Sequence, residues 1–283
     1  MMSRAGTKEY RLAGVMGWPV AHSRSPMIHG YWIDHYGLSG AYVLLPVAPE
    51  RLANALRGLA ALGFAGCNVT IPHKVPALQL VDRVDAFARR IGAINTIVVE
   101  RDGTLSGYNN DGFGYVQSLC DAKPGWRADA GPIVVLGAGG AARAVVATLA
   151  DADAREIRLL NRTPQHALDI AQAVGAVVKA LPWEQRHDAL ADAALVVNTT
   201  SQGMSGQPPL DISLAALPRH ALVSDVIYVP LETPLLAAAR ARGNITVNGL
   251  DMLLNQARPA FKAWFGVMPE ITPELRRRIA ATL

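Results

Sequence analysis

Cysteine is scarce in this sequence, with Cys67 and Cys120 the only two among 283 residues. Two distant cysteines form no disulfide framework and lack zinc-ligand spacing. The seven histidines also lack the spacing of metal ligands, so we expect no metal site. No apolar run reaches the roughly 20 residues that a membrane-spanning helix needs. Because the first ten residues are polar and of mixed charge, unlike a signal peptide, we expect a cytoplasmic protein without a membrane partner.

A cluster of charge of one sign is also missing. Charged residues make up 18% of the chain, and the net charge is only +4. The single basic run, residues 276–278, lies on a predicted terminal helix. A nucleic-acid interface would need a concentrated basic face with aromatic residues, so we expect no nucleic-acid partner. The chain has neither a Walker motif nor a nucleophile elbow.

The sequence does contain two series of alternating strands and helices, and its length suits two domains. The first series predicts strands at 12–17, 42–47, 64–69, 94–99 and 104–108, and helices at 26–37 and 49–62. Ser25 is the expected N-cap of the first helix, with Pro26 at its first position. After a Pro- and Gly-bearing stretch, the second series predicts strands at 133–136, 157–160, 195–198 and 222–227. Its helices are predicted at 139–150, after Pro164, and over most of 250–283. The alternation predicts an α/β fold of two domains with mostly parallel sheets.

A glycine loop opens the second series. Residues 137–142 read Gly-Ala-Gly-Gly-Ala-Ala between a predicted strand and a predicted helix. Glycines there let backbone amides approach a pyrophosphate at a helix N-terminus. The next strand ends in Asn161-Arg162-Thr163 instead of the acid that binds an NAD ribose, and an arginine suits a 2′-phosphate. Residues 198–204 would add ribose and nicotinamide contacts. The sequence thus predicts an NADP site, the alternatives being a tight turn without ligand and an exposed loop arginine.

The segment from Asn68 to Lys74 places an amide, a hydroxyl and a lysine between a strand and a helix that Pro72 is predicted to open. Ligands bind outside the carboxyl ends of strands in open α/β sheets. A lysine there could transfer a proton, although a solvated surface lysine is the simpler interpretation. Other polar candidates beside predicted strand or helix ends are Ser23, Ser25, Asn95 and Asp111. Ser25 and Asp111 could equally be helix caps.

Together these motifs resemble the shikimate dehydrogenase family over residues 13–269. The matching segments, in family order and spacing, are 17–26, 68–74, 92–96, 109–112, the glycine loop, 161–163, 225–228, 233–236 and 249–257. The resemblance implies reversible, NADPH-dependent reduction of 3-dehydroshikimate to shikimate in aromatic amino-acid biosynthesis. It also implies a substrate domain of residues 1–113 and 251–283 and a Rossmann-like NADP domain of residues 114–250.

The resemblance assigns roles to individual residues. Lys74 and Asp111 match the catalytic pair, which also contacts substrate, with Lys74 as proton donor or acceptor. The residues that match the other substrate contacts are Ser23, Ser25 and Tyr228 for the carboxylate, and Asn68, Thr70, Asn95 and Gln256 for the ring hydroxyls or pocket lining. Those that match cofactor contacts are Gly137, Ala138, Gly139, Gly140, Ala141, Asn161, Arg162, Thr163, Thr199, Ile227 and Gly249.

Three positions depart from the family pattern. Asn110 stands where the family usually has threonine, and Gly30 stands where it frequently has asparagine. His166 stands where an arginine often binds the 2′-phosphate, and its loss would weaken the preference for NADP over NAD. Alternative functions are a quinate/shikimate dehydrogenase, often using NAD, an aminoshikimate-pathway dehydrogenase, a non-catalytic NADP-binding sensor and, least well supported, a lysine Schiff-base enzyme. The family contains monomers and dimers, so a monomer or a homodimer is expected.

Overall fold

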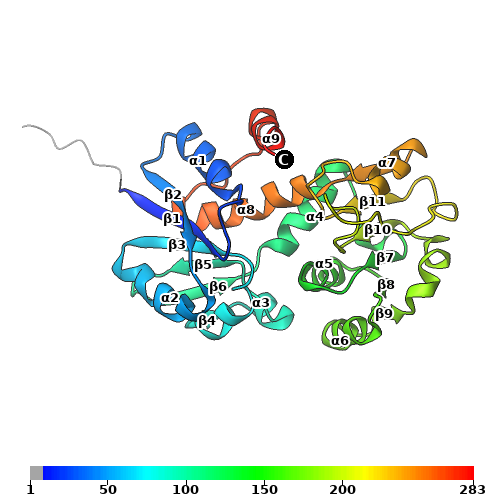
Figure 1. Ribbon diagram of the computed structural model, residues 1–283, viewed down its shortest axis with the longest axis horizontal. Helices are drawn as coiled ribbons and strands as arrows, with labels where there is room; N and C mark the ends of the chain where they lie inside the picture. The colour runs from blue at the N-terminus through cyan, green and yellow to red at the C-terminus, as the bar shows by residue number, and fades with distance from the viewer. Residues whose placement is uncertain (1–8) are drawn as a thin grey trace, which may run out of the picture. The chain divides into compact units, whose positions relative to one another are not determined.

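The computed structural model describes residues 9–283 and divides into two units (Figure 1). Unit 1 contains the chain up to Asn110 and Ala257–Ile279, and unit 2 contains Asp111–Gln256 and Ala280–Leu283. The sequence placed these boundaries after residues 113 and 250. They differ because helix α4 (Asp111–Ala122) begins at Asp111 and helix α8 (Gly249–Phe265) contributes residues to both units. The expectation of no signal peptide rests mainly on residues 1–8, which lie outside the described part.

Unit 1 is built on a six-stranded sheet in the order β2-β1-β3-β5-β6-β4. Its strands are β1 (Arg11–Gly17), β2 (Gly40–Pro46), β3 (Phe64–Val69), β4 (Arg83–Val84), β5 (Thr96–Val99) and β6 (Leu105–Tyr108). All run parallel except β5, which is antiparallel to both β3 and β6. The reversal follows from the tight turn at Asp102-Gly103, since strands joined by a short hairpin must be antiparallel. The short edge strand β4 had no clear signal in the sequence.

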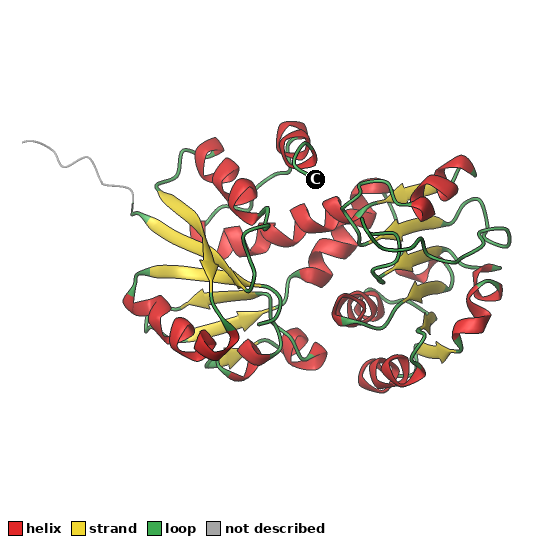
Figure 2. Ribbon diagram, in the orientation of Figure 1, coloured by secondary structure: helices red, strands yellow, loops and turns green. Residues whose placement is uncertain are grey.

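Helices cover both faces of this sheet (Figure 2). One face packs apolar residues against α2 (Leu52–Ala61) and α3 (Ala86–Ile91). On the other face, α1 (Ser25–His35) and α8 bring together the rings of His29, Trp32, Phe261 and Trp264. Helix α9 (Pro273–Ala280) adds Arg278 over the ring of Tyr31. The first unit therefore has one aliphatic layer and one aromatic layer.

Unit 2 has a six-stranded sheet in which every pair of neighbours is parallel, in the order β12-β11-β10-β7-β8-β9. Its strands are β7 (Ile133–Leu136), β8 (Ile157–Leu160), β9 (Val178–Leu181), β10 (Leu195–Asn198), β11 (Leu222–Asp225) and β12 (Ile245–Val247). Numbered from β7 within the unit, the order is 3-2-1-4-5-6, the arrangement of dinucleotide-binding folds. Such a sheet has its ligand crevice where the strand order reverses, here between β7 and β10.

The apolar run of β7 serves both faces of this sheet because successive side chains of a strand point to opposite sides. Ile133 and Val135 pack in one cluster with α4, α5 (Gly140–Asp151) and α6 (Pro164–Val174). Val134 and Leu136 pack in the other with α7 (Pro234–Ala241). Short 3-10 helices lie at Pro49–Arg51, Pro76–Gln79, Ala128–Ala130, Trp183–Arg186 and Asp188–Leu190. No helix within residues 9–283 is long and apolar enough to cross a bilayer.

Gly66 in β3 gives a test of the packing in unit 1. It sits at a register shift against β1 and has φ +153°. A Cβ there would lie 2.0 Å from the carbonyl oxygen of Ile97 and 2.3 Å from Nε1 of Trp264, whose indole donates to that same carbonyl at 3.0 Å. We predict that Gly66→Ala lowers the free energy of unfolding by about 3 kcal/mol or more, because strand and indole must move apart.

Urea denaturation measures this effect. Gly30→Ala in α1 is the matched control, since a Cβ at Gly30 meets nothing within 4 Å. The control should be neutral or stabilising by up to about 1 kcal/mol. Equal stability of the Gly66 variant and wild type would show that the Trp264–Ile97 contact is not a packing constraint.

Candidate functional site

Lys74 lies in a turn, and not in the first turn of a helix as the sequence predicted. The residues after Pro72 form turns, and only Pro76–Gln79 close into a short 3-10 helix. An α-helix starting at Pro72 would need a hydrogen bond from the amide of residue 76 to the carbonyl of Pro72, and Pro76 has no amide hydrogen. The carbonyl of Lys74 instead accepts a hydrogen bond from the amide of Ile94 at 2.9 Å.

Three neighbouring segments fix the backbone that carries Lys74. The amide of Thr70 donates to the carbonyl of Met16 at 2.9 Å, which ties the turn to the end of β1. His73 is fully buried, and its Nε2 lies 2.7 Å from the carbonyl of Val47, just beyond β2. Because a carbonyl only accepts, Nε2 carries the hydrogen of that bond. Lys74 is half-buried between these anchors.

Ser25 is not the N-cap of α1, contrary to the sequence prediction. Arg24 occupies the cap position and no side chain caps the helix, so Pro26 is the second helical residue, whereas the sequence predicted it at the first position. The side chain of Ser25 instead lies near the hydroxyl of Tyr42. The amide of Ser25 donates to Oγ of Ser23 at 3.3 Å, so the two serines lie side by side at the start of α1.

Asn68 and Asn95 are also brought together in unit 1. Both are buried, and Nδ2 of Asn68 donates to the carbonyl of Asn95 at 3.1 Å. The amide of Asn110 donates to Oδ1 of Asn95 at 2.9 Å. Asn110 thus belongs to the same polar cluster as two predicted substrate residues, at the carboxyl ends of β3 and β6.

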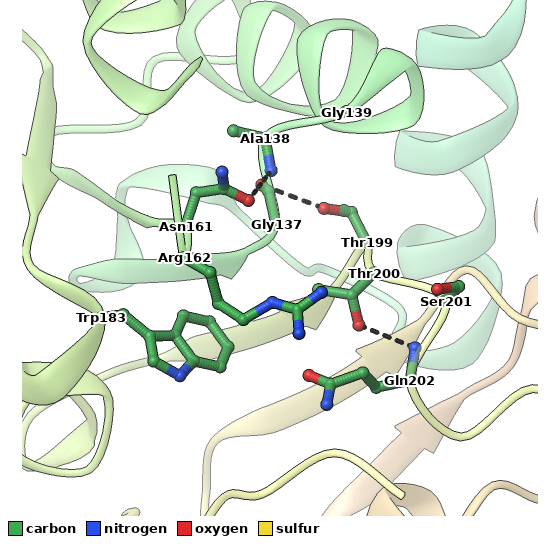
Figure 3. A pocket seen from close by; sticks show the side chains of 10 residues that line it. All are labelled: Gly137, Ala138, Gly139, Asn161, Arg162, Trp183, Thr199, Thr200, Ser201 and Gln202. Atoms are coloured by element: carbon green, nitrogen blue, oxygen red, sulfur yellow. Dashed lines mark hydrogen bonds between the residues drawn. The ribbon is translucent and has the colours of Figure 1, made fainter. Parts of the chain in front are cut away.

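Unit 2 has a cavity of about 250 Å³ at the carboxyl ends of β7, β8 and β10 (Figure 3). Its lining residues are Gly137, Ala138, Gly139, Asn161, Arg162, Trp183, Thr199, Thr200, Ser201 and Gln202. Gly137 has φ +102°, and a Cβ there would lie 2.8 Å from Oγ1 of Thr199, so the loop needs glycine at this position. Gly139, the N-cap of α5, has open space where a Cβ would be and offers no side-chain cap to the first turn. An open helix N-terminus of this kind suits a phosphate group.

Asn161 holds the glycine loop in place. Its Oδ1 accepts from the amide of Ala138 at 3.1 Å, and its Nδ2 donates to the carbonyl of Thr163 at 2.9 Å. Arg162 is exposed and has no hydrogen bond or ion pair with any residue of the 9–283 range. His166 lies in the first turn of α6 and is also exposed. This edge of the cavity therefore offers a guanidinium group for an anion, beside the indole of Trp183 (Figure 3).

A buried amide and a buried carboxylate hold the loop after β10, whose residues 199–202 line the cavity. Nδ2 of Asn198 lies 3.2 and 3.1 Å from the two carboxylate oxygens of Asp225 and also donates to the carbonyl of Gln202 at 3.1 Å. Oδ1 of Asn198 accepts from the amide and hydroxyl of Thr200 at 3.0 and 2.8 Å. The hydroxyl of Thr199 donates to the carbonyl of Leu136 at 2.8 Å, so it braces the glycine loop. The loop after β10 is thereby fixed against both β7 and β11.

Asp225 also positions residues beyond β11. Its carboxylate accepts from the amide of Ile227 at 3.0 Å and from the hydroxyl of Thr233, the N-cap of α7, at 2.8 Å. Burial raises the pKa of this carboxyl above its usual value of 3.8. The amide of Gly249 donates to the carbonyl of Ile227 at 2.9 Å. Tyr228, which follows Ile227 in the chain, is half-buried.

The remaining predicted residues lie on helices of unit 2. Gly140 and Ala141 are the first two residues of α5, and Thr163 is the N-cap of α6. Asp111 is the first residue of α4. Gln256 on α8 contacts this end of α4, since a Cβ at Gly114 would lie 2.6 Å from Cβ of Gln256.

Sequence reasoning missed several residues that shape these sites. Asn198 and Asp225 belong to the segments 198–204 and 225–228 that the sequence singled out, but sequence reasoning did not predict that they hold the loops after their strands. Trp183 and Tyr42 belong to no motif, and only folding brings them to the cavity and to Asn68. Within the described residues, no group of three His, Cys, Asp or Glu side chains could hold a metal ion.

Comparison with known proteins relates both units to one family. Residues 15–97 match the family model for the shikimate dehydrogenase substrate binding domain, and residues 123–205 match the model for shikimate / quinate 5-dehydrogenase. A shikimate dehydrogenase (NADP(+)) of Paramagnetospirillum magneticum is 54% identical over 266 residues, covering 94% of this chain and 96% of the relative.

Solved structures are similar over nearly the whole chain. A shikimate 5-dehydrogenase of Thermus thermophilus, in complex with NADP(H) and shikimate, has a TM-score of 0.84 and 34% identity, covering 96% of this chain and 100% of that one. A quinate dehydrogenase of Corynebacterium glutamicum, in complex with NAD, has a TM-score of 0.89 and 29% identity, with the same coverage.

Asp225 gives a prediction on stability. We expect Asp225→Asn to lower the free energy of unfolding by about 1–3 kcal/mol, because the new NH2 group would face groups that now donate to the carboxylate. The folded-state pKa of Asp225 is raised, so the folded protein binds this proton more readily than the unfolded chain. The stability of wild type relative to the variant should therefore rise as the pH falls from neutral through that raised pKa, and level off below about 3.8.

Urea titrations of both proteins at several pH values measure this difference. Asp188→Asn is the control, because Asp188 is exposed in a 3-10 helix of the same unit. A pH-independent difference would mean that Asp225 has the same pKa in the folded and unfolded states.

Proposed function

The chain belongs to the shikimate dehydrogenase family, and we propose that it reduces 3-dehydroshikimate to shikimate reversibly with NADPH, with Lys74 as the proton donor. In this proposal unit 1 binds the substrate and unit 2 binds NADP. The observation that carries the assignment is the fixed turn after β3, where backbone bonds to Met16 and Ile94 hold Lys74 at the edge of the sheet. A proton donor must be held in place to act in every turnover.

The chemistry of the reduction defines what Lys74 has to do. NADPH supplies the hydride when it is bound, and negative charge then develops on the substrate's carbonyl oxygen. A protonated amine beside that oxygen stabilises the charge and delivers the proton. In the reverse direction the neutral amine accepts the proton of the shikimate hydroxyl. Asp111, at the start of α4, is assigned the supporting carboxylate of the pair.

The substrate's other groups are assigned to the remaining polar residues. Ser23 and Ser25, side by side at the start of α1, suit the carboxylate, with Tyr228 assisting. The substrate residues assigned to the ring hydroxyls or the pocket lining are Asn68, Thr70, Asn95 and Gln256. The buried hydrogen bond between Asn68 and Asn95 supports this assignment, because buried amides with fixed partners present a defined polar surface.

The cavity in unit 2 fits the proposed cofactor. Open space at Gly139 and an uncapped α5 suit the pyrophosphate. Arg162, exposed at the end of β8, is assigned the 2′-phosphate of NADP. The other proposed cofactor contacts are Gly137, Ala138, Gly140, Ala141, Asn161, Thr163, Thr199, Ile227 and Gly249.

The alternatives differ from this proposal in testable ways. A quinate/shikimate or aminoshikimate enzyme would accept other ring substrates, and an NADP-binding sensor would bind the cofactor without turnover. The paired serines and Arg162 favour shikimate and NADP. We also propose a cytoplasmic location, since Cys67 and Cys120 are free thiols. A monomer and a homodimer both remain compatible with the proposal.

Lys74 is tested by substitution. We predict that Lys74→Ala lowers kcat for shikimate oxidation by about 10²- to 10⁴-fold, with a much smaller change in the Kd for shikimate, because the proton transfer is lost. Lys262→Ala, at an exposed position of α8, is the control and should keep wild-type rates. Steady-state kinetics and calorimetric binding measure both. A Lys74 variant with wild-type kcat would rule out the proposed role.

Cofactor preference tests Arg162. We expect Arg162→Ala to raise the KM for NADP⁺ by about tenfold or more and to leave the KM for NAD⁺ nearly unchanged, since only NADP⁺ carries the 2′-phosphate. His166→Arg should increase the preference for NADP⁺ by adding a second guanidinium in the same helix start. The ratio of kcat/KM for the two cofactors is the measurement. Equal losses with both would place the 2′-phosphate elsewhere.

A further inference from the structure

The amide of Asn68 has a fixed orientation. Its Nδ2 lies 3.1 Å from the carbonyl of Asn95, and its Oδ1 lies 2.6 Å from the hydroxyl of Tyr42. A backbone carbonyl can only accept, so the NH2 group must face Asn95. The oxygen then faces Tyr42, and Tyr42 is the donor of that bond.

Both hydrogens of the Asn68 amide are used within unit 1. The second one goes to Oγ1 of Thr96 at 3.2 Å. That hydroxyl also accepts from Nδ2 of Asn110 at 3.0 Å and donates its own hydrogen to Oδ1 of Asn95 at 2.9 Å. The direction of this last bond agrees with the backbone amide of Asn110, a pure donor, which points at the same oxygen.

With partners from residues 9–283 counted, the only hydrogen-bonding position left open on Asn68 is an acceptor. An amide oxygen has two lone pairs, and Tyr42 takes one of them. Asn68 is 6% exposed, so little water competes for the other. A ligand can therefore approach Asn68 only with a hydrogen-bond donor.

Tyr42 is held by stacking on one side and by a hydrogen bond at its hydroxyl. The rings of His29 and Tyr42 are parallel, at an interplanar angle of 1° and a centroid separation of 4.0 Å. Burial lowers the pKa of His29 to about 3, so the ring stays neutral at ordinary pH. Burial raises the pKa of Tyr42 well above its usual value, so its hydroxyl keeps its hydrogen. That hydroxyl donates to Oδ1 of Asn68.

We propose that Tyr42 is a positioning residue for substrate binding, whose hydroxyl orients Asn68 as a pure acceptor for a ring hydroxyl that takes no part in the reaction. The inference rests on the proposed function. The reacting group alternates between a carbonyl, which only accepts, and a hydroxyl. An acceptor at Asn68 would oppose the carbonyl form, whereas a non-reacting hydroxyl donates in both directions of the reaction.

Tyr42→Phe tests this inference, since it keeps the ring and its stack on His29 and removes only the hydroxyl. We expect the KM for shikimate to rise about tenfold or more, because the Asn68 amide loses the partner that orients it. The KM for 3-dehydroshikimate should rise by the same factor, and the KM for NADP⁺ should not change. Tyr31→Phe is the matched control, because it removes a hydroxyl that bonds Oγ1 of Thr272 at 2.7 Å elsewhere in unit 1. The control should leave all three constants unchanged.

A double-substitution cycle separates positioning from general packing. In an Asn68→Ala background, Tyr42→Phe should change the KM for shikimate by no more than about twofold, because Tyr42 acts through Asn68. Additive losses, a rise with only one of the two ring substrates, or wild-type constants for Tyr42→Phe would overturn the inference while the proposed function stands. A wild-type protein that does not oxidise shikimate with NADP⁺ would overturn the proposed function, and this inference with it.

Discussion

A buried asparagine at the carboxyl end of a central strand constrains each unit of this protein. Asn68 is the second-last residue of β3 and Asn198 is the last residue of β10. Both side chains are buried. A buried amide has to satisfy two donor hydrogens and an acceptor oxygen, or folding loses free energy. The loops that follow the strands provide these partners. The requirement therefore fixes the loops as well as the side chain, and the loops carry the proposed ligand contacts.

In unit 1 the reversed strand β5 makes this arrangement possible. Because β5 is antiparallel to β3, Thr96 at its start pairs with Asn68 near the end of β3. Tyr108 at the end of β6 pairs with the same Thr96. The amino end of one strand thus lies among the carboxyl ends of its neighbours, and it brings Asn95 and Asn110 to Asn68. A fully parallel sheet would place the start of β5 at the opposite edge.

In unit 2 the partner of the buried asparagine is a carboxylate. Asp225 accepts from Asn198, Ile227 and Thr233, so one carboxylate orders the loops after β10 and β11. Asn161 likewise orders the glycine loop after β7, because its Oδ1 accepts from the amide of Ala138. These polar groups are directed at the protein's own backbone, whereas Arg162 at the cavity edge has no partner in the described chain. Asp225 and Asn161 therefore hold the loops of the site in place, whereas the guanidinium of Arg162 is available to an anion.

The sequence by itself determined the fold class, most strands of both sheets and the family, because apolar periodicity and short motifs are local properties. Strands β3, β7, β8 and β10 have the predicted bounds. Two local predictions were wrong: Arg24 and not Ser25 occupies the cap position of α1, and Lys74 lies in a turn, with its carbonyl accepting from the amide of Ile94, instead of in a helix. Only the tertiary structure decided the direction of each amide in the Asn68 cluster. That direction depends on carbonyls and hydroxyls far away in the sequence, and no local pattern encodes which of them will become neighbours.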